Sequence, residues 1–250
     1  MEKILKKLVA YLTTGYPDIK FTQDAAYALK EAGVDMLELG MPFSDPVADG
    51  PIIEKANLKS LQNGFKMDDL FELSNSISKD IDTLWMGYFN PFYQKGMLDM
   101  AKKATEYGVN GFIIPDLPYE EANIYSADLA KNDIALINFV APTDSHDRIK
   151  TILHDAQNFI YLVAYAGITG SGKSEDLTKV IEDIRSVSKT DIFIGFGVNS
   201  ETAKDKVKGV DGVIVGSEFV KVLLDDKINN TQKITKIASI AREIKEKINS

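Results

Sequence analysis

The stretch Leu37-Glu-Leu-Gly-Met-Pro-Phe-Ser-Asp-Pro-Val-Ala-Asp-Gly-Pro51 joins a short apolar run to a loop rich in Gly and Pro. Glu38 lies inside the apolar run, which is typical of a buried strand, and Asp49 lies on the loop. An ionised carboxylate is costly in a buried strand unless a partner or a reaction uses it. Glu38 is therefore a candidate acid or base, with a buried structural ion pair as the alternative. Asp49 is the second candidate, with a loop-capping role as its alternative.

Working outward from this stretch, runs rich in Val, Ile, Leu and aromatic residues alternate with amphipathic segments, as in βα units around a parallel sheet. Eight runs predict strands over 8–13, 35–39, 84–88, 111–115, 135–140, 159–164, 192–196 and 212–215. The segments between them predict helices over 22–31, 67–78, 97–107, 120–131, 146–155, 174–186, 200–206 and 234–248. Eight repeats favour the α/β class and a single (β/α)8 TIM barrel over an open, doubly wound sheet.

No linker, low-complexity stretch or long charge run divides the chain, so we expect residues 1–250 to form one barrel domain. The segment before the first strand is short, and we expect it to leave apolar strand ends exposed at the bottom of the barrel. A barrel of this type builds its site from the loops that follow the carboxyl ends of its strands. Both candidate carboxylates lie at or after such an end.

The composition excludes several classes of function. Cysteine is absent, which excludes a thiolate nucleophile and cysteine-rich metal sites. The only histidines, His146 and His154, lie on a predicted surface helix, so we expect no metal site. The net charge of −8 argues against nucleic acid or an anionic membrane as a partner. No apolar run is long enough for a signal peptide or a membrane span, and we expect a cytoplasmic protein.

Three glycine-bearing loops in the second half of the chain predict a phosphate site. They carry Gly170, Gly197 and the pair Gly216 and Ser217. Their backbone N–H groups, with those of a helix that begins at Ser217, provide donors for one anion. A single glycine of this kind indicates only a tight turn, whereas three following neighbouring strands favour a phosphate cup.

The string Gly167-Ile-Thr-Gly-Ser-Gly-Lys-Ser174 matches the phosphate-loop pattern of nucleotide-binding proteins. However, the downstream strands do not end in a magnesium-binding Asp, and such folds usually begin with this motif instead of carrying it late in the chain. We therefore favour a flexible lid over residues 171–176, with Lys173 solvated, over ATP or GTP chemistry.

The stretch from Leu37 to Pro51 resembles the signature of the tryptophan synthase alpha subunit family, whose members are (β/α)8 barrels. The resemblance runs from about residue 10 to residue 221 and is highly specific. It implies a carbon–carbon lyase of tryptophan biosynthesis, which cleaves indole-3-glycerol phosphate to indole and glyceraldehyde 3-phosphate by a retro-aldol reaction. The other matching motifs, in the family's order, are Gly15-Tyr-Pro17, Tyr88-Phe-Asn90, Ile114-Pro-Asp-Leu-Pro118, Ala166-Gly-Ile-Thr-Gly170, Gly195-Phe-Gly197 and Val215-Gly-Ser217.

The resemblance places Glu38 and Asp49 at the two catalytic carboxylates. Glu38 is implied to protonate C3 of the indole and to take the proton of the adjacent hydroxyl, for which a near-neutral pKa helps. Asp49 is implied to stay ionised in a polar surrounding and to accept the indole N–H. An indole pocket is implied at Tyr11, Met86, Ile113, Tyr161, Thr169 and Phe196.

The resemblance also implies that this chain needs no cofactor. A partner beta subunit is implied to carry pyridoxal phosphate, in an α2β2 heterotetramer with substrate channelling. Loops 42–45, 90–91 and 116–118 are implied to face that partner. Two alternatives stay open at this point: another phosphate-binding barrel, such as a sugar-phosphate isomerase, and a non-catalytic activator of a beta subunit, which would tolerate loss of Glu38.

Overall fold

A parallel sheet of nine strands forms the centre of the computed structural model, which describes residues 5–163 and 177–250. Each pairing between neighbouring strands is parallel, in the order β5-β4-β3-β2-β1-β9-β8-β7-β6. The strands are β1 (Lys7–Thr13), β2 (Met36–Gly40), β3 (Asp82–Met86), β4 (Gly111–Ile113), β5 (Ala135–Leu136), β6 (Asn138–Val140), β7 (Phe159–Val163), β8 (Asp191–Gly195) and β9 (Gly212–Val215).

The sheet closes through the fifth predicted run. That run is split at Ile137 into β5, which pairs with β4, and β6, which pairs with β7. The N–H of Ile137 still donates to the carbonyl of Phe112 in β4, at 2.9 Å. One short segment therefore contacts β4 with its first half and β7 with its second half. The predicted (β/α)8 barrel is confirmed, with its fifth strand divided between two neighbours.

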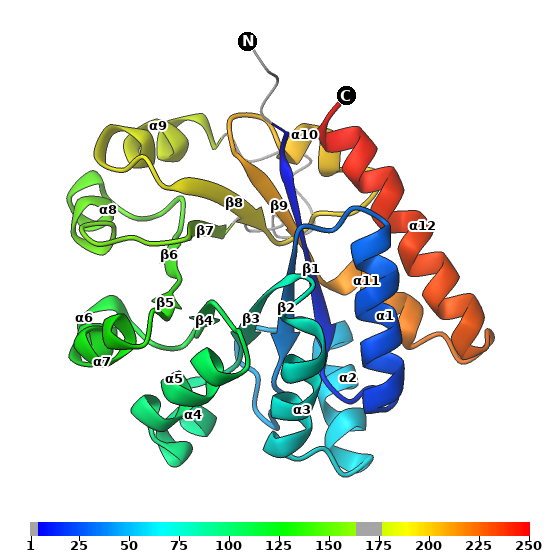
Figure 1. Ribbon diagram of the computed structural model, residues 1–250. Coiled ribbons are helices and arrows are strands. Elements are labelled where there is room, and N and C mark those ends of the chain that lie inside the picture. Colours follow the sequence, from blue (N-terminus) through cyan, green and yellow to red (C-terminus); the bar gives the residue numbers. More distant parts are fainter. Residues whose placement is uncertain (1–4, 164–176) are drawn as a thin grey trace.

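The helices surround the barrel on its outside, as Figure 1 shows. Helices α1 and α12 come from opposite ends of the chain and lie side by side (Figure 1). The helices are α1 (Ile19–Glu31), α2 (Pro51–Gln62), α3 (Met67–Ile77), α4 (Phe89–Lys95), α5 (Met97–Glu106), α6 (Tyr119–Ala122), the 3₁₀ helix η1 (Asn123–Tyr125), α7 (Ser126–Lys131), α8 (His146–Ile152), α9 (Thr178–Val187), α10 (Ala203–Lys206), α11 (Ser217–Leu223) and α12 (Asn230–Ile248).

Two helices were not predicted, α2 and α4. Helix α2 begins at Pro51, directly after Gly50, so the residues that start it also read as a loop. Proline suits the first position of a helix because its missing N–H has no acceptor there, and its φ already fits. Helix α4 contains Pro91 in its first turn, where the same reasoning applies. In both places, a segment that reads as a loop in the sequence contains the first residues of a helix.

Alternation along the strands sends one set of side chains inward and the other toward the helices. In β2, Met36 belongs to the cluster inside the barrel, whereas Leu37 and Leu39 belong to the outer cluster that the helices cover. Because side chains alternate between the two faces of a strand, Glu38 points inward, as Met36 does. The outer apolar neighbours thus fix the direction of the carboxylate.

Apolar side chains at the amino ends of the strands, such as Leu8, Met36 and Phe159, are buried, which contradicts their expected exposure, whereas Leu5 just before β1 is 63% exposed. Phe159 and Phe193 fill the interior of the barrel and are at most 1% exposed. The start of β1 is also tied to the last helix: the Asp35 carboxylate accepts the N–H of Leu8 at 2.6 Å and the ammonium of Lys245 at 2.5 Å. Large interior side chains and this ion pair therefore stabilise the end of the barrel at which the segment before β1 is short.

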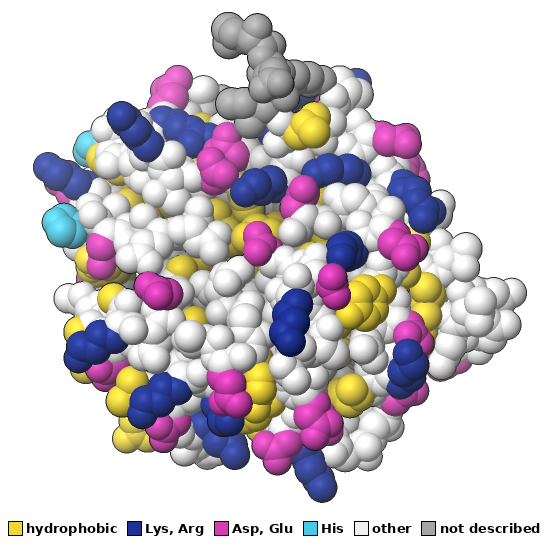
Figure 2. Space-filling view, in the orientation of Figure 1, with side chains coloured by type: hydrophobic (Ala, Val, Ile, Leu, Met, Phe, Trp, Pro, Cys, Tyr) yellow, Lys and Arg dark blue, Asp and Glu magenta, His cyan; other side chains and the backbone are white. Residues whose placement is uncertain are grey.

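The surface carries charges of both signs. Figure 2 shows acidic and basic side chains interspersed over the face in view, without a broad patch of one sign on that face. No helix among the described residues is long and apolar enough to cross a membrane.

Candidate active site

A cavity of about 510 Å³ opens at the carboxyl ends of the strands and contains both predicted carboxylates. Its size lies within the ~300–1,000 Å³ of typical small-molecule sites. Glu38 reaches it from β2, with 3% of its surface exposed. One carboxyl oxygen of Glu38, Oε1, has no hydrogen-bond partner among the described residues. No described cation forms an ion pair with Glu38, so the structure offers no support for a buried salt bridge.

Asp49 enters the same cavity from the loop between β2 and α2. Its Oδ2 accepts the side-chain amide of Asn57 at 3.0 Å, and Asn57 is itself buried on α2. The hydroxyl of Tyr88, which lies between β3 and α4, accepts the N–H of Ala48 at 3.0 Å. The helix and the segment after β3 therefore hold the loop in place beside the carboxylate. Neither was predicted as a partner of Asp49: Asn57 lies on α2, a helix that was not predicted, and Tyr88 was noted only within the motif Tyr88-Phe-Asn90.

The two carboxylates have different pKa values. Burial, and then the charge of Asp49, raise the pKa of Glu38 to about 8. Burial also raises the pKa of Asp49, to about 6, although hydrogen bonds from Asn57 and Tyr88 oppose the rise. At pH 7 Glu38 is mostly protonated and Asp49 mostly ionised. Asp49 is half-buried, and the hydrogen bonds from Asn57 and Tyr88 stabilise its charged form.

Two tyrosines lie against glycines at equivalent places in the barrel. Tyr11 is the register partner of Glu38, and its ring lies over Gly40, two residues further along β2. In the same way Tyr161 lies over Gly195, two residues beyond its register partner on β8. A Cβ atom on Gly40 would be 2.2 Å from the Tyr11 hydroxyl oxygen, so only glycine leaves room for the ring. Thr13 donates to that oxygen at 3.4 Å.

We predict that Gly40→Ala destabilises the protein by about 1–3 kcal/mol, because the new methyl group displaces the buried Tyr11 ring. Gly50→Ala is the matched control, since a Cβ there meets nothing within 4 Å. It changes only a helix N-cap residue and is expected to cost less than about 1 kcal/mol. Urea unfolding of both variants measures the difference. Equal losses of unfolding free energy in the two variants would show that the close approach of Tyr11 to Gly40 does not require a glycine.

The described residues of the predicted indole pocket all line this one cavity: Tyr11, Met86, Ile113, Tyr161 and Phe196. Thr169 lies outside the described residues. Tyr161 stacks on Phe139 with ring centroids 4.9 Å apart and meets Phe196 edge-on at 6.4 Å. The wall also contains apolar residues that were not predicted, namely Ile52, Ile53, Pro115, Phe139 and Ile214. Phe139 and Ile214 occupy inward-facing positions of their strands, and this alternation is the only feature of the sequence that indicates their place in the cavity wall.

Gly197, Gly216 and Ser217 line the same cavity and follow the neighbouring strands β8 and β9. The hydroxyl of Thr202 donates to the carbonyl of Gly197 at 2.8 Å, which fixes the loop after β8. Helix α11 begins at Ser217, so the first N–H groups of that turn have no acceptor within the helix. Three of the four predicted phosphate residues thus meet in one place. Gly170, the predicted lid at 171–176 with Lys173, and the string 167–174 lie outside the described residues.

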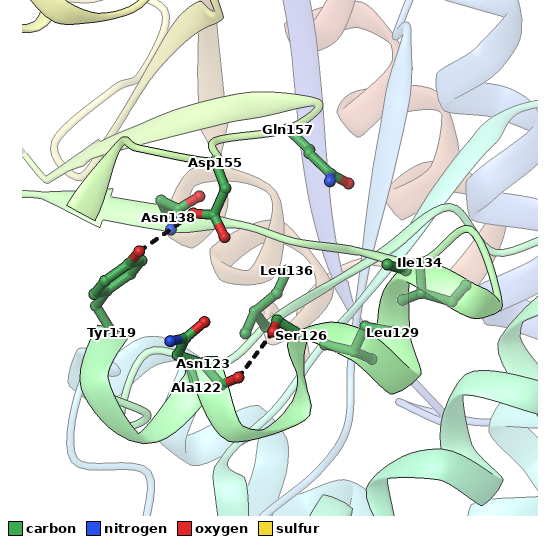
Figure 3. Close-up of a pocket in the computed structure, with 11 residues that line it drawn as sticks. Tyr119, Ala122, Asn123, Ser126, Leu129, Ile134, Leu136, Asn138, Asp155 and Gln157 are labelled. Carbon is green, nitrogen blue, oxygen red and sulfur yellow. Dashed lines mark hydrogen bonds between the residues drawn. The ribbon is translucent and has the colours of Figure 1, made fainter. Parts of the chain in front are cut away.

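A second, smaller cavity of about 60 Å³ lies outside the barrel, beside α6, η1 and α7 (Figure 3). Tyr119 donates to Asp155 across it at 3.5 Å. The space is far below that of typical ligand sites. Within residues 5–163 and 177–250, no group of three or more His, Asp or Glu side chains is placed to hold a metal ion. A further cavity of about 300 Å³, lined in part by Asp116, Asp144 and Arg148, contains neither predicted carboxylate, so the cavity of about 510 Å³ is the candidate active site.

Comparison with known proteins assigns the family. The sequence matches the family described as tryptophan synthase alpha chain over residues 1–249. The chain belongs to that family. A tryptophan synthase alpha chain from Wolinella succinogenes is 57% identical, over 98% of this chain and 97% of its own length. The prediction of a tryptophan synthase alpha chain, a lyase of tryptophan biosynthesis, is confirmed, and neither alternative is supported.

Solved tryptophan synthase structures share the fold. Tryptophan synthase subunit alpha from Campylobacter jejuni is 35% identical with a TM-score of 0.85, covering 96% of this chain and 95% of that one. A chain from the tryptophan synthase a2b2 complex of Pyrococcus furiosus is 27% identical with a TM-score of 0.83, covering 97% and 99%. The barrel of this chain is therefore that of tryptophan synthase alpha chains.

Proposed function

We propose that this chain cleaves indole-3-glycerol phosphate to indole and glyceraldehyde 3-phosphate in the 510 Å³ cavity, with Glu38 and Asp49 as its catalytic residues. The observation that carries the proposal is the pair of carboxylates on one wall, one mostly protonated and one mostly ionised at pH 7. A reaction that needs both a proton donor and an anion requires such a pair. The aromatic side chains suit the indole, and the N–H groups near Gly197, Gly216 and Ser217 suit the phosphate.

In the proposed reaction, the Glu38 carboxyl gives its proton to C3 of the indole. The ring becomes cationic at N1, where the Asp49 carboxylate accepts the N–H and stabilises the charge. The ionised Glu38 then takes the proton of the side-chain hydroxyl next to C3. The electrons of that O–H bond form the aldehyde carbonyl, and those of the C–C bond return to the ring. Indole is released, and Glu38 ends the cycle protonated as it began.

We propose that this chain needs no cofactor for the cleavage, because protonation at C3 already creates the electron sink. Pyridoxal phosphate is expected in a partner beta subunit only. We propose an α2β2 assembly, the assembly in which the Pyrococcus furiosus tryptophan synthase was solved. Loops 42–45, 90–91 and 116–118 are proposed to face that partner, and the exposed side chains of Val47 and Tyr93 lie close in sequence to the first two. A cytoplasmic location is proposed with this role.

The deciding measurement is release of indole from indole-3-glycerol phosphate by the purified chain, with and without a tryptophan synthase beta subunit. We expect slow release by the chain alone and faster release in the complex, because partner binding should favour closure of the site. Absence of indole from a demonstrated complex would overturn the proposed reaction. It would leave a phosphate-binding cavity of another specificity.

A further inference from the structure

The charges around the cavity are unfavourable for a phosphate ester. Among the described residues that line it, Glu38, Asp49 and Glu218 are acidic, and Lys221 is the only basic one. A phosphate monoester carries between one and two negative charges at pH 7. The whole chain has a net charge of −8, so long-range attraction does not assist its binding. N–H groups alone supply only partial positive charge for such an anion.

Lys221 is placed to supply a full charge. It lies on α11 four residues after Ser217, and residues spaced by four occupy the same face of a helix. Side chains on a helix lean toward its amino end, so Lys221 leans back toward the turn that contains Ser217. One helical turn rises about 5.4 Å, a distance that an extended lysine side chain can span.

The ammonium of Lys221 is also uncommitted. It forms no hydrogen bond or ion pair with any residue of the described chain. Glu218 lies three residues earlier on the same helix, yet the two side chains form no ion pair. Most exposed lysines of this chain that form pairs do so with an acid three or four residues away. Lys221 has such an acid three residues away, yet it forms no ion pair with any described residue and belongs to the cavity lining.

We propose that Lys221 binds the substrate phosphate as a countercharge, above the N–H groups of Gly216 and Ser217, and so selects phosphorylated over unphosphorylated substrates. The proposal rests on the proposed function, because it assigns the phosphate end of the same site. Lys221 makes no contact with the reacting carbon atoms. Its role is therefore in binding, and the chemical step at Glu38 does not depend on it.

The test compares Lys221→Met, Lys221→Arg and the control Lys236→Met in the full chain assembled with a beta subunit. Lys236 is exposed on α12, away from the cavity lining, and its loss changes the net charge equally. We expect Lys221→Met to raise the KM for indole-3-glycerol phosphate about tenfold or more and to leave kcat within about twofold. Lys221→Arg keeps the charge and is expected to stay within about threefold of wild type in KM. Lys236→Met is expected to match wild type.

A binding experiment separates this inference from the lyase reaction. Calorimetric titration with inorganic phosphate should give a weaker Kd for Lys221→Met than for wild type and Lys236→Met, whether or not indole is released. If phosphate binding depends on Lys221 but no indole appears, the lyase reaction fails and the countercharge stands. Equal phosphate affinity of wild type, Lys221→Met and Lys236→Met would overturn the proposed role of Lys221. A drop in kcat with unchanged KM would also overturn it, because Lys221 would then act on the chemical step.

Discussion

Glu38→Gln is expected to lower kcat for indole release by about 10³-fold, within the range that general acid–base groups contribute. Glutamine has the same shape but cannot transfer a proton to C3 or take one from the hydroxyl. Indole release by the complex with a beta subunit measures the loss. Glu72→Gln is the matched control, since Glu72 lies exposed on α3 and its change should leave the rate unaltered. Retention of activity by Glu38→Gln would remove Glu38 from the reaction.

The same variant distinguishes an acid from a structural ion pair. The pKa of Glu38 is raised to about 8 in the folded protein, mainly by burial. Below pH 4.5 the group is protonated in both states and costs nothing. Between pH 4.5 and 8 the unfolded chain ionises first, so the fold loses stability as pH rises. Glu38→Gln removes this loss and should be more stable than wild type at about pH 8.5, by an amount on the order of 5 kcal/mol, but not at about pH 4.5. A structural ion pair predicts the opposite: lower stability of the variant in the alkaline measurement.

The strand that carries Glu38 was predictable because its signal is local. Leu37 and Leu39 flank one carboxylate, and alternation then requires the carboxylate to face away from the apolar outer layer. The division of the fifth run at Ile137 was not predictable in this way. It arises because the segment completes two ladders with different neighbours, β4 and β7, and this depends on closure of the whole barrel.

The residues around Asp49 show more clearly what could not be predicted from the sequence. The loop that carries Asp49 is rich in Gly and Pro, and folding brings Asn57 and Tyr88 against the carboxylate from α2 and from the segment after β3. Nothing local marks either residue as a partner of Asp49. Likewise, Phe139 lines the cavity while Phe159 fills the barrel, although both are aromatic residues on interior strand positions. Their different roles come from their height in the barrel, which periodicity does not report.

Asp49→Asn is expected to lower kcat by about 10²–10³-fold, the effect of removing one electrostatic contact to a transition state. Asparagine keeps an oxygen that can accept the amide of Asn57 and the indole N–H, so the geometry is preserved and the negative charge is lost. The developing charge at N1 then lacks its counterion. A rate within about threefold of wild type would instead assign Asp49 to holding its loop, and an accompanying loss of stability would support that role.

The pH dependence tests the two carboxylates together. The reaction requires an ionised Asp49, so the wild-type rate should fall as pH drops through about 6. It also requires a protonated Glu38, so the rate should fall as pH rises through about 8. The optimum is therefore expected near pH 7. Asp49→Asn should lose the fall on the acid side and keep the fall on the alkaline side, because only Glu38 still titrates. In this variant the negative charge of Asp49 no longer opposes ionisation of Glu38, so the pKa of Glu38 drops. The fall in rate on the alkaline side should therefore move to lower pH. An unchanged alkaline limb would show that the two carboxylates do not interact.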